Sequence, residues 1–105
     1  MATSRRKDFQ LVLEGYMEGK GNVYFQPPAN VKIHYPCIIY SLYRYDTRHA
    51  DNILYRMKPS YTVTYIDTNP DADFPETYLK TQPMTHFDRE YTSDNLHHWV
   101  FTTYY

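Results

Sequence analysis

The residues of this chain best suited to bind a metal ion are histidines and an aspartate in its C-terminal part. His86 and Asp88 are two positions apart, so a β-strand would place both on one face. His97 and His98 follow after a short polar stretch, and a turn there would bring them near that face. None of these residues has a recognised zinc-ligand spacing. The pattern favours a hydrogen-bonded polar strand face, and we predict no metal and no other cofactor.

The candidate nucleophiles are one cysteine and three internal serines. Cys37 lies inside the apolar run YPCIIY at residues 35–40, where an inert buried thiol is far more common than a reactive one. The serines have no glycine beside them that would form a catalytic elbow; they are Ser41, Ser60 and Ser93. The 3 glycines follow a helical pattern and form no phosphate-binding loop. We therefore predict no enzymatic activity, and a small metal-dependent enzyme that combines Cys37 with the histidines above is the outside alternative.

The charge balance of the chain argues against tight binding to nucleic acids. The chain has 11 Lys and Arg residues against 12 Asp and Glu residues, a formal net charge of -1, whereas affinity for a phosphate backbone needs excess positive charge. The only basic cluster, RRK at residues 5–7, is typical of the solvated first turn of a helix.

The length and composition predict one folded domain, residues 1–105, with a single core. A hydrophobic content of 42% excludes a disordered chain, and scattered charges predict no membrane span. The single cysteine and the absence of an apolar N-terminal signal predict synthesis in a reducing cytoplasm.

Hydrophobic periodicity predicts an N-terminal helix that starts near Ser4. Apolar residues recur at intervals of three and four positions and form one stripe that would lie on a sheet; they are Phe9, Val12, Leu13, Tyr16 and Met17. Thr3 or Ser4 can cap the start of this helix, and Gly19 or Gly21 can end it.

The middle of the chain is predicted to form strands. Residues 23–26 read as a short edge strand that two prolines stop. Residues 37–46 and 54–67 would pair as an antiparallel hairpin across a polar loop at residues 47–52. Pro59 marks a bulge or kink in this hairpin.

A short second helix and a last hairpin complete the expected fold. Asp73 can cap this helix with Pro75 in its first turn. The residues expected to face inward are Phe74, Tyr78 and Leu79. Residues 84–91 and 96–105 form the hairpin around the polar turn TSDN. The predicted fold class is α+β, with an antiparallel sheet of four to five strands packed against the N-terminal helix, in two layers.

Large side chains on both faces of two predicted strands indicate an assembly. The segments YTVTYI at residues 61–66 and WVFTTYY at residues 99–105 carry large or β-branched residues at consecutive positions. One covered face of a sheet would not bury all of them. The chain also contains 13 tyrosines, whose rings can pack at an interface while their hydroxyls stay near water. We therefore predict that the chain is a subunit of a larger assembly.

Two segments are candidate contacts with neighbouring subunits. The stretch at residues 45–52 mixes both signs of charge, which suits contacts that fix the register of a neighbouring copy, although a merely solvated loop fits the pattern equally well. The terminal tyrosines add aromatic surface. The predicted interface residues are Arg48, His49, Asp51, Asn52, Tyr104 and Tyr105.

Several segments, read together, resemble a family of small tail proteins of tailed bacteriophages. They are YPCIIY at residues 35–40, DTR and ADN within residues 46–52, YTVTYID and NPD within residues 61–71, and FDREYTSDNLHH and VFT within residues 87–102. The resemblance covers almost the whole chain. On this resemblance the chain is identified as a member of the tail terminator family, also called the tail completion or tail-to-head joining family, to which neighbouring neck proteins are similar in size.

The resemblance implies a structural protein of the virion tail or neck, made in the host cytoplasm and without catalytic activity. Such proteins pair an antiparallel sheet with flanking helices and form a hexameric ring that caps the tail tube. The implied partners are other copies of the chain, the tail tube protein and the head-side connector or stopper protein. DNA would pass through the lumen without specific binding, which a net charge of -1 permits. The alternative is a head-completion or connector protein on the other side of the joint.

Overall fold

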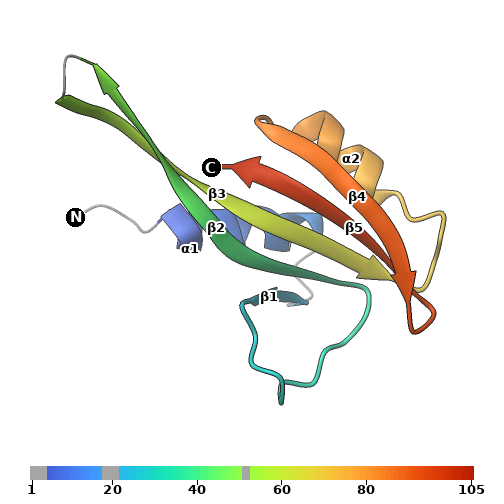
Figure 1. The fold of residues 1–105 in the computed structure, drawn as a ribbon. Helices are drawn as coiled ribbons and strands as arrows, with labels where there is room; N and C mark the ends of the chain where they lie inside the picture. Colours follow the sequence, from blue (N-terminus) through green and yellow to red (C-terminus); the bar gives the residue numbers. More distant parts are fainter. Residues whose placement is uncertain (1–4, 18–21, 51–52) are drawn as a thin grey trace.

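The described part of the chain folds into two helices and a five-stranded sheet (Figure 1). The computed structural model describes residues 5–17, 22–50 and 53–105, and side chains at residues 6–17, 22–43 and 60–105. The elements follow in the order α1 (Arg5–Tyr16), β1 (Val23–Phe25), β2 (Cys37–Ala50), β3 (Ile53–Asp67), α2 (Phe74–Thr81), β4 (Thr85–Ser93) and β5 (Leu96–Tyr104). The predicted α+β class is confirmed.

The strands follow the order β1-β2-β3-β5-β4 across the sheet. The pairs β2–β3, β3–β5 and β5–β4 are antiparallel. β1 is an edge strand, as predicted, but it runs parallel to β2, so the sheet is mixed. Periodicity could not reveal this direction, because a three-residue strand alternates in the same way in either orientation.

α1 lies on the sheet through the apolar stripe that the sequence predicted. Phe9 and Leu13 are fully buried. The ring of Phe9 packs against the rings of Tyr40 and Tyr61, at centroid distances of 5.6 and 4.9 Å. The side-chain oxygen of Gln10 accepts a hydrogen bond from the hydroxyl of Tyr40, which ties the helix to β2. The capping residues predicted for both ends of α1 lie outside the described residues.

α2 begins beside the predicted cap, but the prediction that all three of its apolar residues face inward is wrong for one of them. Asp73 occupies the N-cap position without a capping hydrogen bond from its side chain, and Pro75 lies in the first turn. Phe74 and Tyr78 are buried, whereas Leu79 is 41% exposed. Phe74 and Tyr78 are about one helical turn apart and share a face, and Leu79 lies about 100° further round the helix.

A two-residue turn joins β4 to β5 and confirms the last predicted hairpin. Asp94 and Asn95 have φ angles of 53° and 64°, a left-handed conformation that Asp and Asn tolerate and that tight hairpin turns need. β4 is the edge strand at this side of the sheet, and nearly all of its side chains are exposed. A bulge between Phe87 and Arg89 interrupts its pairing with β5.

Both helices cover the same face of the sheet and lie behind it in Figure 1. The core of this covered face contains Tyr40, Tyr61, Val63, Tyr65, Trp99 and Phe101. Phe9 of α1 packs on Tyr61, and Phe74 of α2 stacks on Tyr65. No described helix lies on the opposite face, which we call the open face. Its central residues include the half-buried Ile39, Ser41, Thr62, Thr64 and Thr102 and the buried Ile66 and Val100.

β2 and β3 extend far beyond the rest of the sheet (Figure 1). β1 pairs with β2 only at residues 38–40, and β5 pairs with β3 only at residues 60–67. Residues 44–59 therefore contain a two-stranded ribbon that pairs with no third strand among the described residues, and we call this ribbon the arm. The arm gives the molecule its long dimension of 51 Å, against 27 and 24 Å in the other directions.

The arm takes the place of the polar loop predicted at residues 47–52. β2 continues to Ala50, and β3 starts at Ile53. Polar sequence misled the prediction here, because the polar residues 47–50 continue the strand β2 in place of a loop. Pro59 pairs with Tyr45, and the nearest register shift lies between Leu42 and Arg44 of the opposite strand.

Candidate subunit interface

The arm concentrates positive charge in a chain that is acidic elsewhere. Its charged residues are the basic Arg44, Arg48, Arg56 and Lys58 and the acidic Asp46 and Asp51. The arm thus has a net charge of +2, and of the chain's 11 basic and 12 acidic residues the rest keeps seven and ten, a net charge of -3. Arg48 and Arg56 are direct partners in the ladder, and like charges at opposite positions destabilise a strand pair. An acidic partner would relieve this repulsion.

The structure describes four of the six residues predicted to touch neighbouring subunits. Arg48 and His49 lie in β2 near its tip, while Asp51 and Asn52 lie outside the described residues. The terminal tyrosines lie instead near the base of the arm, because the backbone of Tyr104 pairs with Ser60.

The two terminal tyrosines occupy different environments. The ring of Tyr105 stacks on Phe9, with centroids 5.0 Å apart, and packs against the core of the body (residues 5–17, 22–43 and 60–105). Tyr104 shares the open face with Thr102, two positions before it in β5. Of the two side chains, that of Tyr104 is therefore better placed to meet a neighbouring copy beside the arm.

At least four other tyrosines serve the core, which the tyrosine count alone did not indicate. Tyr40, Tyr61, Tyr65 and Tyr78 are buried. The hydroxyl of Tyr78 forms a buried hydrogen bond of 2.6 Å with Thr103, and burial raises its pKa. These hydroxyls give the aromatic core fixed polar contacts, so a tyrosine-rich strand indicates a core as well as an interface.

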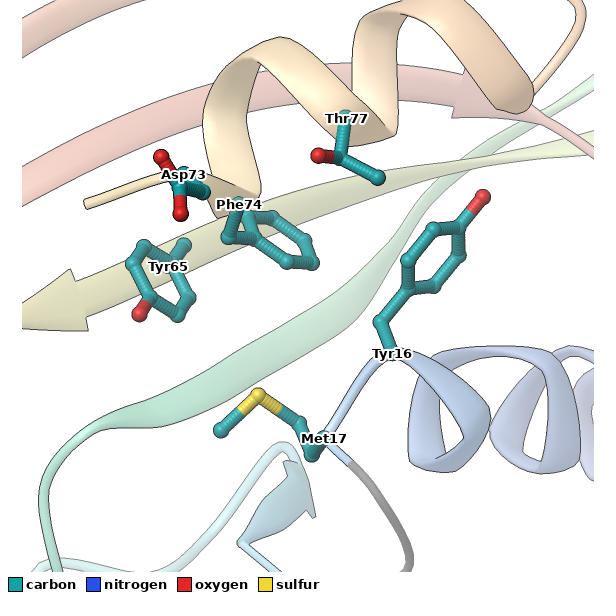
Figure 2. Close-up of a pocket in the computed structure, with 6 residues that line it drawn as sticks. All are labelled: Tyr16, Met17, Tyr65, Asp73, Phe74 and Thr77. Atoms are coloured by element: carbon teal, nitrogen blue, oxygen red, sulfur yellow. The ribbon is translucent and has the colours of Figure 1, made fainter.

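A pocket of about 260 Å³ lies between the two helices (Figure 2). It is at the end of the sheet opposite the arm, since β3 begins in the arm and passes Tyr65 just before it ends at Asp67. The residues that line it are Tyr16, Met17, Tyr65, Asp73, Phe74 and Thr77. Phe74 stacks on Tyr65 at a centroid distance of 4.4 Å, and Tyr16 meets the Phe74 ring edge-on at 5.6 Å.

The surroundings of this pocket are acidic. Residues 67–79 contain four acidic residues and no basic residue. The hydroxyl of Tyr65 donates a hydrogen bond of 2.6 Å to the carboxylate of Asp67. Burial, then the hydrogen bond and charge of Asp67, and also the charge of Asp73 raise the pKa of Tyr65, so this phenol stays neutral. The carboxylate of Asp73 lies at the pocket wall and does not cap α2.

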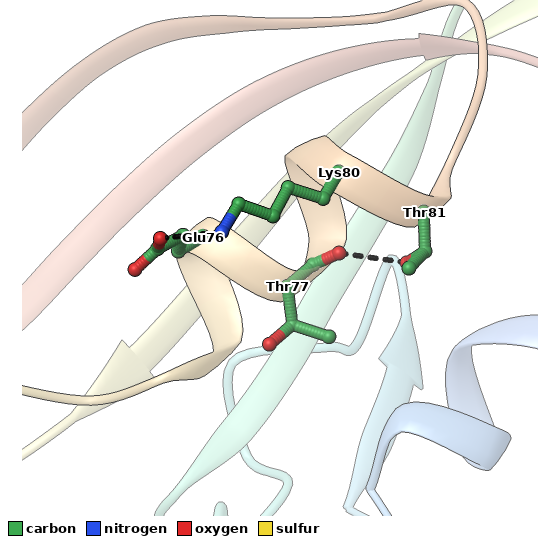
Figure 3. A network of polar contacts seen from close by, with 4 residues as sticks. All are labelled: Glu76, Thr77, Lys80 and Thr81. Atoms are coloured by element: carbon green, nitrogen blue, oxygen red, sulfur yellow. Dashed lines mark hydrogen bonds and ion pairs between the residues drawn. The ribbon is translucent and has the colours of Figure 1, made fainter.

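Short hydrogen bonds on α2 help to fix the wall of the pocket (Figure 3). The hydroxyl of Thr81 donates to the carbonyl oxygen of Thr77 at 2.7 Å and also lies 2.7 Å from the hydroxyl of Tyr16, which links α2 to α1. Lys80 donates to Glu76 at 2.7 Å, and this contact lowers the pKa of Glu76. Both side chains of that pair are largely exposed, so the pair adds little stability.

The residues of the alternative metal site do not converge. His86 is exposed on the edge strand β4. The carboxylate of Asp88 accepts a hydrogen bond of 2.7 Å from Thr102, and Nδ1 of His97 lies 3.2 Å from the hydroxyl of Thr92. Among the residues whose positions are described, no three His, Cys, Asp or Glu residues form a group that could hold a metal ion.

The single cysteine lies at the start of β2, away from solvent. Cys37 is fully buried, as the apolar run predicted. Burial, with a smaller contribution from the charge of Asp67, raises its pKa to about 12. A thiol with this pKa is protonated at neutral pH and is a poor nucleophile.

The comparisons with known proteins add no named relative to this geometry. Within the described residues, no helix is long and apolar enough to cross a membrane. No protein-family model matches the chain, and no curated protein matches it.

Proposed function

We propose that this chain is the subunit of a hexameric ring that caps the tail tube of a tailed bacteriophage and joins the tail to the head-side connector. The observation that carries the proposal is the arm. An isolated two-stranded hairpin is marginally stable in water, and the arm pairs with no third strand among the described residues. A neighbouring copy in a ring would supply the contacts that the arm lacks within its own chain.

The polarity of the molecule also supports a ring. The arm lies at one end of β3 and the acidic pocket at the other, so the two ends offer different surfaces. Contacts between unlike surfaces of identical subunits are head-to-tail, and they produce a closed ring when the rotation between subunits closes.

The longer segments that carry the family resemblance lie in four strands of the sheet, β2, β3, β4 and β5. YPCIIY, at residues 35–40, leads into β2, and YTVTYID, at residues 61–67, is the end of β3. The segment at residues 87–98 spans the turn between β4 and β5. The resemblance implies an antiparallel sheet with flanking helices. The mixed sheet of this chain, in which only β1 is parallel to its neighbour, is compatible with that architecture.

In this proposal the ring binds the tail tube protein on one side and the connector or stopper protein on the other, within the virion. DNA passes through the lumen without specific binding. A net charge of -1 per subunit favours free passage, because a lumen with a large excess of Lys and Arg would retain a polyanion.

The test is to purify the chain, determine its mass by native mass spectrometry, and image it with isolated tail tubes and with isolated connectors. We expect hexameric rings located at tube ends. Rings that bind connectors but never tube ends would instead support the head-completion alternative. A monomer that binds neither partner would contradict both.

A further inference from the structure

We infer that the pocket between α1 and α2 is a receptor for an arginine side chain from the arm of a neighbouring copy. This inference rests on the proposed ring and specifies which surfaces meet within it. The occupant is a second copy of the chain, and the contact joins Arg48 or Arg56 of one subunit to the Asp73 end of the next.

The chemistry of the pocket suits a guanidinium group. The rings of Tyr65 and Phe74 lie near Asp73, and the ring of Tyr16 lies on the other side of the pocket (Figure 2). A guanidinium can stack on aromatic rings and pair with a carboxylate at the same time. The volume of about 260 Å³ is below the roughly 300 to 1,000 Å³ of sites for drug-sized ligands. The pocket therefore fits one side chain better than a small-molecule ligand.

The local charges attract a cation in spite of the helix that borders the pocket. The N-terminal end of a helix carries a partial positive charge, but Asp73 lies at this end of α2. Glu76 is in the same turn, and its charge is already paired with Lys80. Asp71 and Asp67 add further negative charge in the preceding loop. The carboxylate of Asp73 makes no capping hydrogen bond with α2, so it can accept one from a partner.

The arm supplies the matching charge. It carries four basic residues and two acidic residues, whereas residues 67–79 carry four acidic residues and no basic residue. The ladder places Arg48 opposite Arg56, and a carboxylate between such a pair would offset their repulsion. The basic arm and the acidic pocket region belong to the same chain. This favours a second copy of the chain, and not a different protein, as the partner that fills the pocket.

The dimensions allow this contact between copies. Residues 44–50 of β2 extend beyond the body, and at about 3.3 Å per residue they reach about 23 Å. This reach is similar to the shorter dimensions of the molecule, 27 and 24 Å. An arm can therefore span a neighbouring subunit, while the opposite positions of arm and pocket prevent a subunit from occupying its own pocket.

The experiment uses an arm variant, R48E/R56E, and a pocket variant, D73K, in the full-length chain. The matched controls are K7E and E90K, which reverse exposed charges outside both surfaces. Sedimentation velocity in low salt measures self-association, and circular dichroism with thermal melting checks that each variant is folded. We expect the self-association Kd to rise about tenfold or more for the arm and pocket variants, and to be unchanged in both controls.

Mixing the two variants is the sharper test. The arm variant keeps an intact pocket and the pocket variant keeps an intact arm, so one intact interface can form between them. We expect the mixture to associate more strongly than either variant alone, because an intact arm meets an intact pocket and the reversed charges at the other two ends also attract each other. Combining R48E/R56E with D73K in one chain should restore part of the association, since the reversed charges again attract.

Three outcomes would overturn the inference. The first is a D73K variant that assembles like E90K. The second is a mixture that behaves like the two separate variants. The third is an arm variant that assembles normally but loses binding to a DNA duplex, which would assign the basic residues to DNA. If D73K forms normal rings that cap tail tubes, this inference is wrong and the proposed function stands. If rings form through the arm and the pocket but bind neither tubes nor connectors, the inference stands and the proposed function is wrong.

Discussion

The body and the arm are built from the same two strands but are stabilised in different ways. In the body, β2 and β3 lie under two helices, and their alternate residues enter an aromatic core. In the arm, the same strands pair only with each other among the described residues. Backbone pairing between β2 and β3 is continuous across the boundary, and the described core residues belong to the body. The comparison suggests a difference that can be tested: in the proposed ring, the body would fold on its own contacts and the arm would be stabilised by a neighbour.

The largest expected effect comes from removing a core ring at the contact between α1 and the sheet. Phe9 is fully buried and packs against Tyr40, Tyr61 and Tyr105. We expect Phe9→Ala to lower the free energy of unfolding by about 3 to 5 kcal/mol, as measured by urea denaturation. The exposed Leu11 on the same helix is the control, and Leu11→Ala should have little effect. Equal losses in the two variants would contradict the placement of the core.

The pH dependence of stability tests the buried thiol. Its pKa is raised from 9.0 to about 12 in the folded chain. Above pH 9 the thiol ionises in the unfolded state but not in the folded state, so the unfolded state binds fewer protons and stability falls as the pH rises towards 12. Cys37 contributes at most about 4 kcal/mol to this loss.

Burial also raises the pKa values of Tyr65 and Tyr78, which act in the same direction above pH 10. We therefore expect Cys37→Ala to reduce the slope of stability against pH without abolishing it. Urea denaturation at several pH values between 7 and 11 measures the slope. An identical slope in the variant would show that the thiol is not buried as described.

A smaller effect is expected from one hydroxyl inside the core. The hydroxyl of Tyr78 lies 2.6 Å from that of Thr103, which is also 2.9 Å from the hydroxyl of Thr85. We expect Tyr78→Phe to destabilise the fold by about 1 kcal/mol, because Thr103 keeps one of its partners. Tyr91→Phe, at an exposed position of β4, is the control. A loss above about 3 kcal/mol would mean that the ring itself has moved.

The smallest effect on stability is expected from removing the arm. A variant that joins Tyr43 to Ser60 through an Asn-Gly turn lacks residues 44–59 and keeps the body. We expect its free energy of unfolding to change by less than about 1 kcal/mol, because the variant keeps all of the described core residues. Self-association should disappear in sedimentation velocity. A variant that loses several kcal/mol would show that the arm supports the body of its own chain.

Hydrophobic periodicity predicted the elements that have a core to face. The stripe on α1 follows from residues such as Phe9 and Leu13, which are buried. The edge position of β1 was predicted from the two prolines after it, and the last hairpin from its polar turn. Elements without a buried side were harder to predict. The arm reads as a polar loop, and the parallel direction of β1 depends on the path of residues 26–36, which no local pattern encodes.

The candidate site was predicted only in part. Arg48 and His49 were singled out for their mixed charge, and the structure places them in the arm. The pocket was missed, because its lining comes from α1, β3 and α2, which are distant in the sequence. The acidic stretch at residues 67–79 was the one available signal, and its lack of Lys and Arg is visible in the sequence.

The bulge in β4 is a feature that can prevent copies of this chain from aggregating through their edge strands. An exposed outermost strand is a template on which further strands can add, and such addition leads to fibrils. In β4 the ladder is broken where Asp88, Arg89 and Glu90 follow one another. A bend and three adjacent charges there discourage a foreign strand from joining. A protein made in many copies would then be protected from indiscriminate aggregation along this border, while its projecting ribbon stays available for orderly assembly.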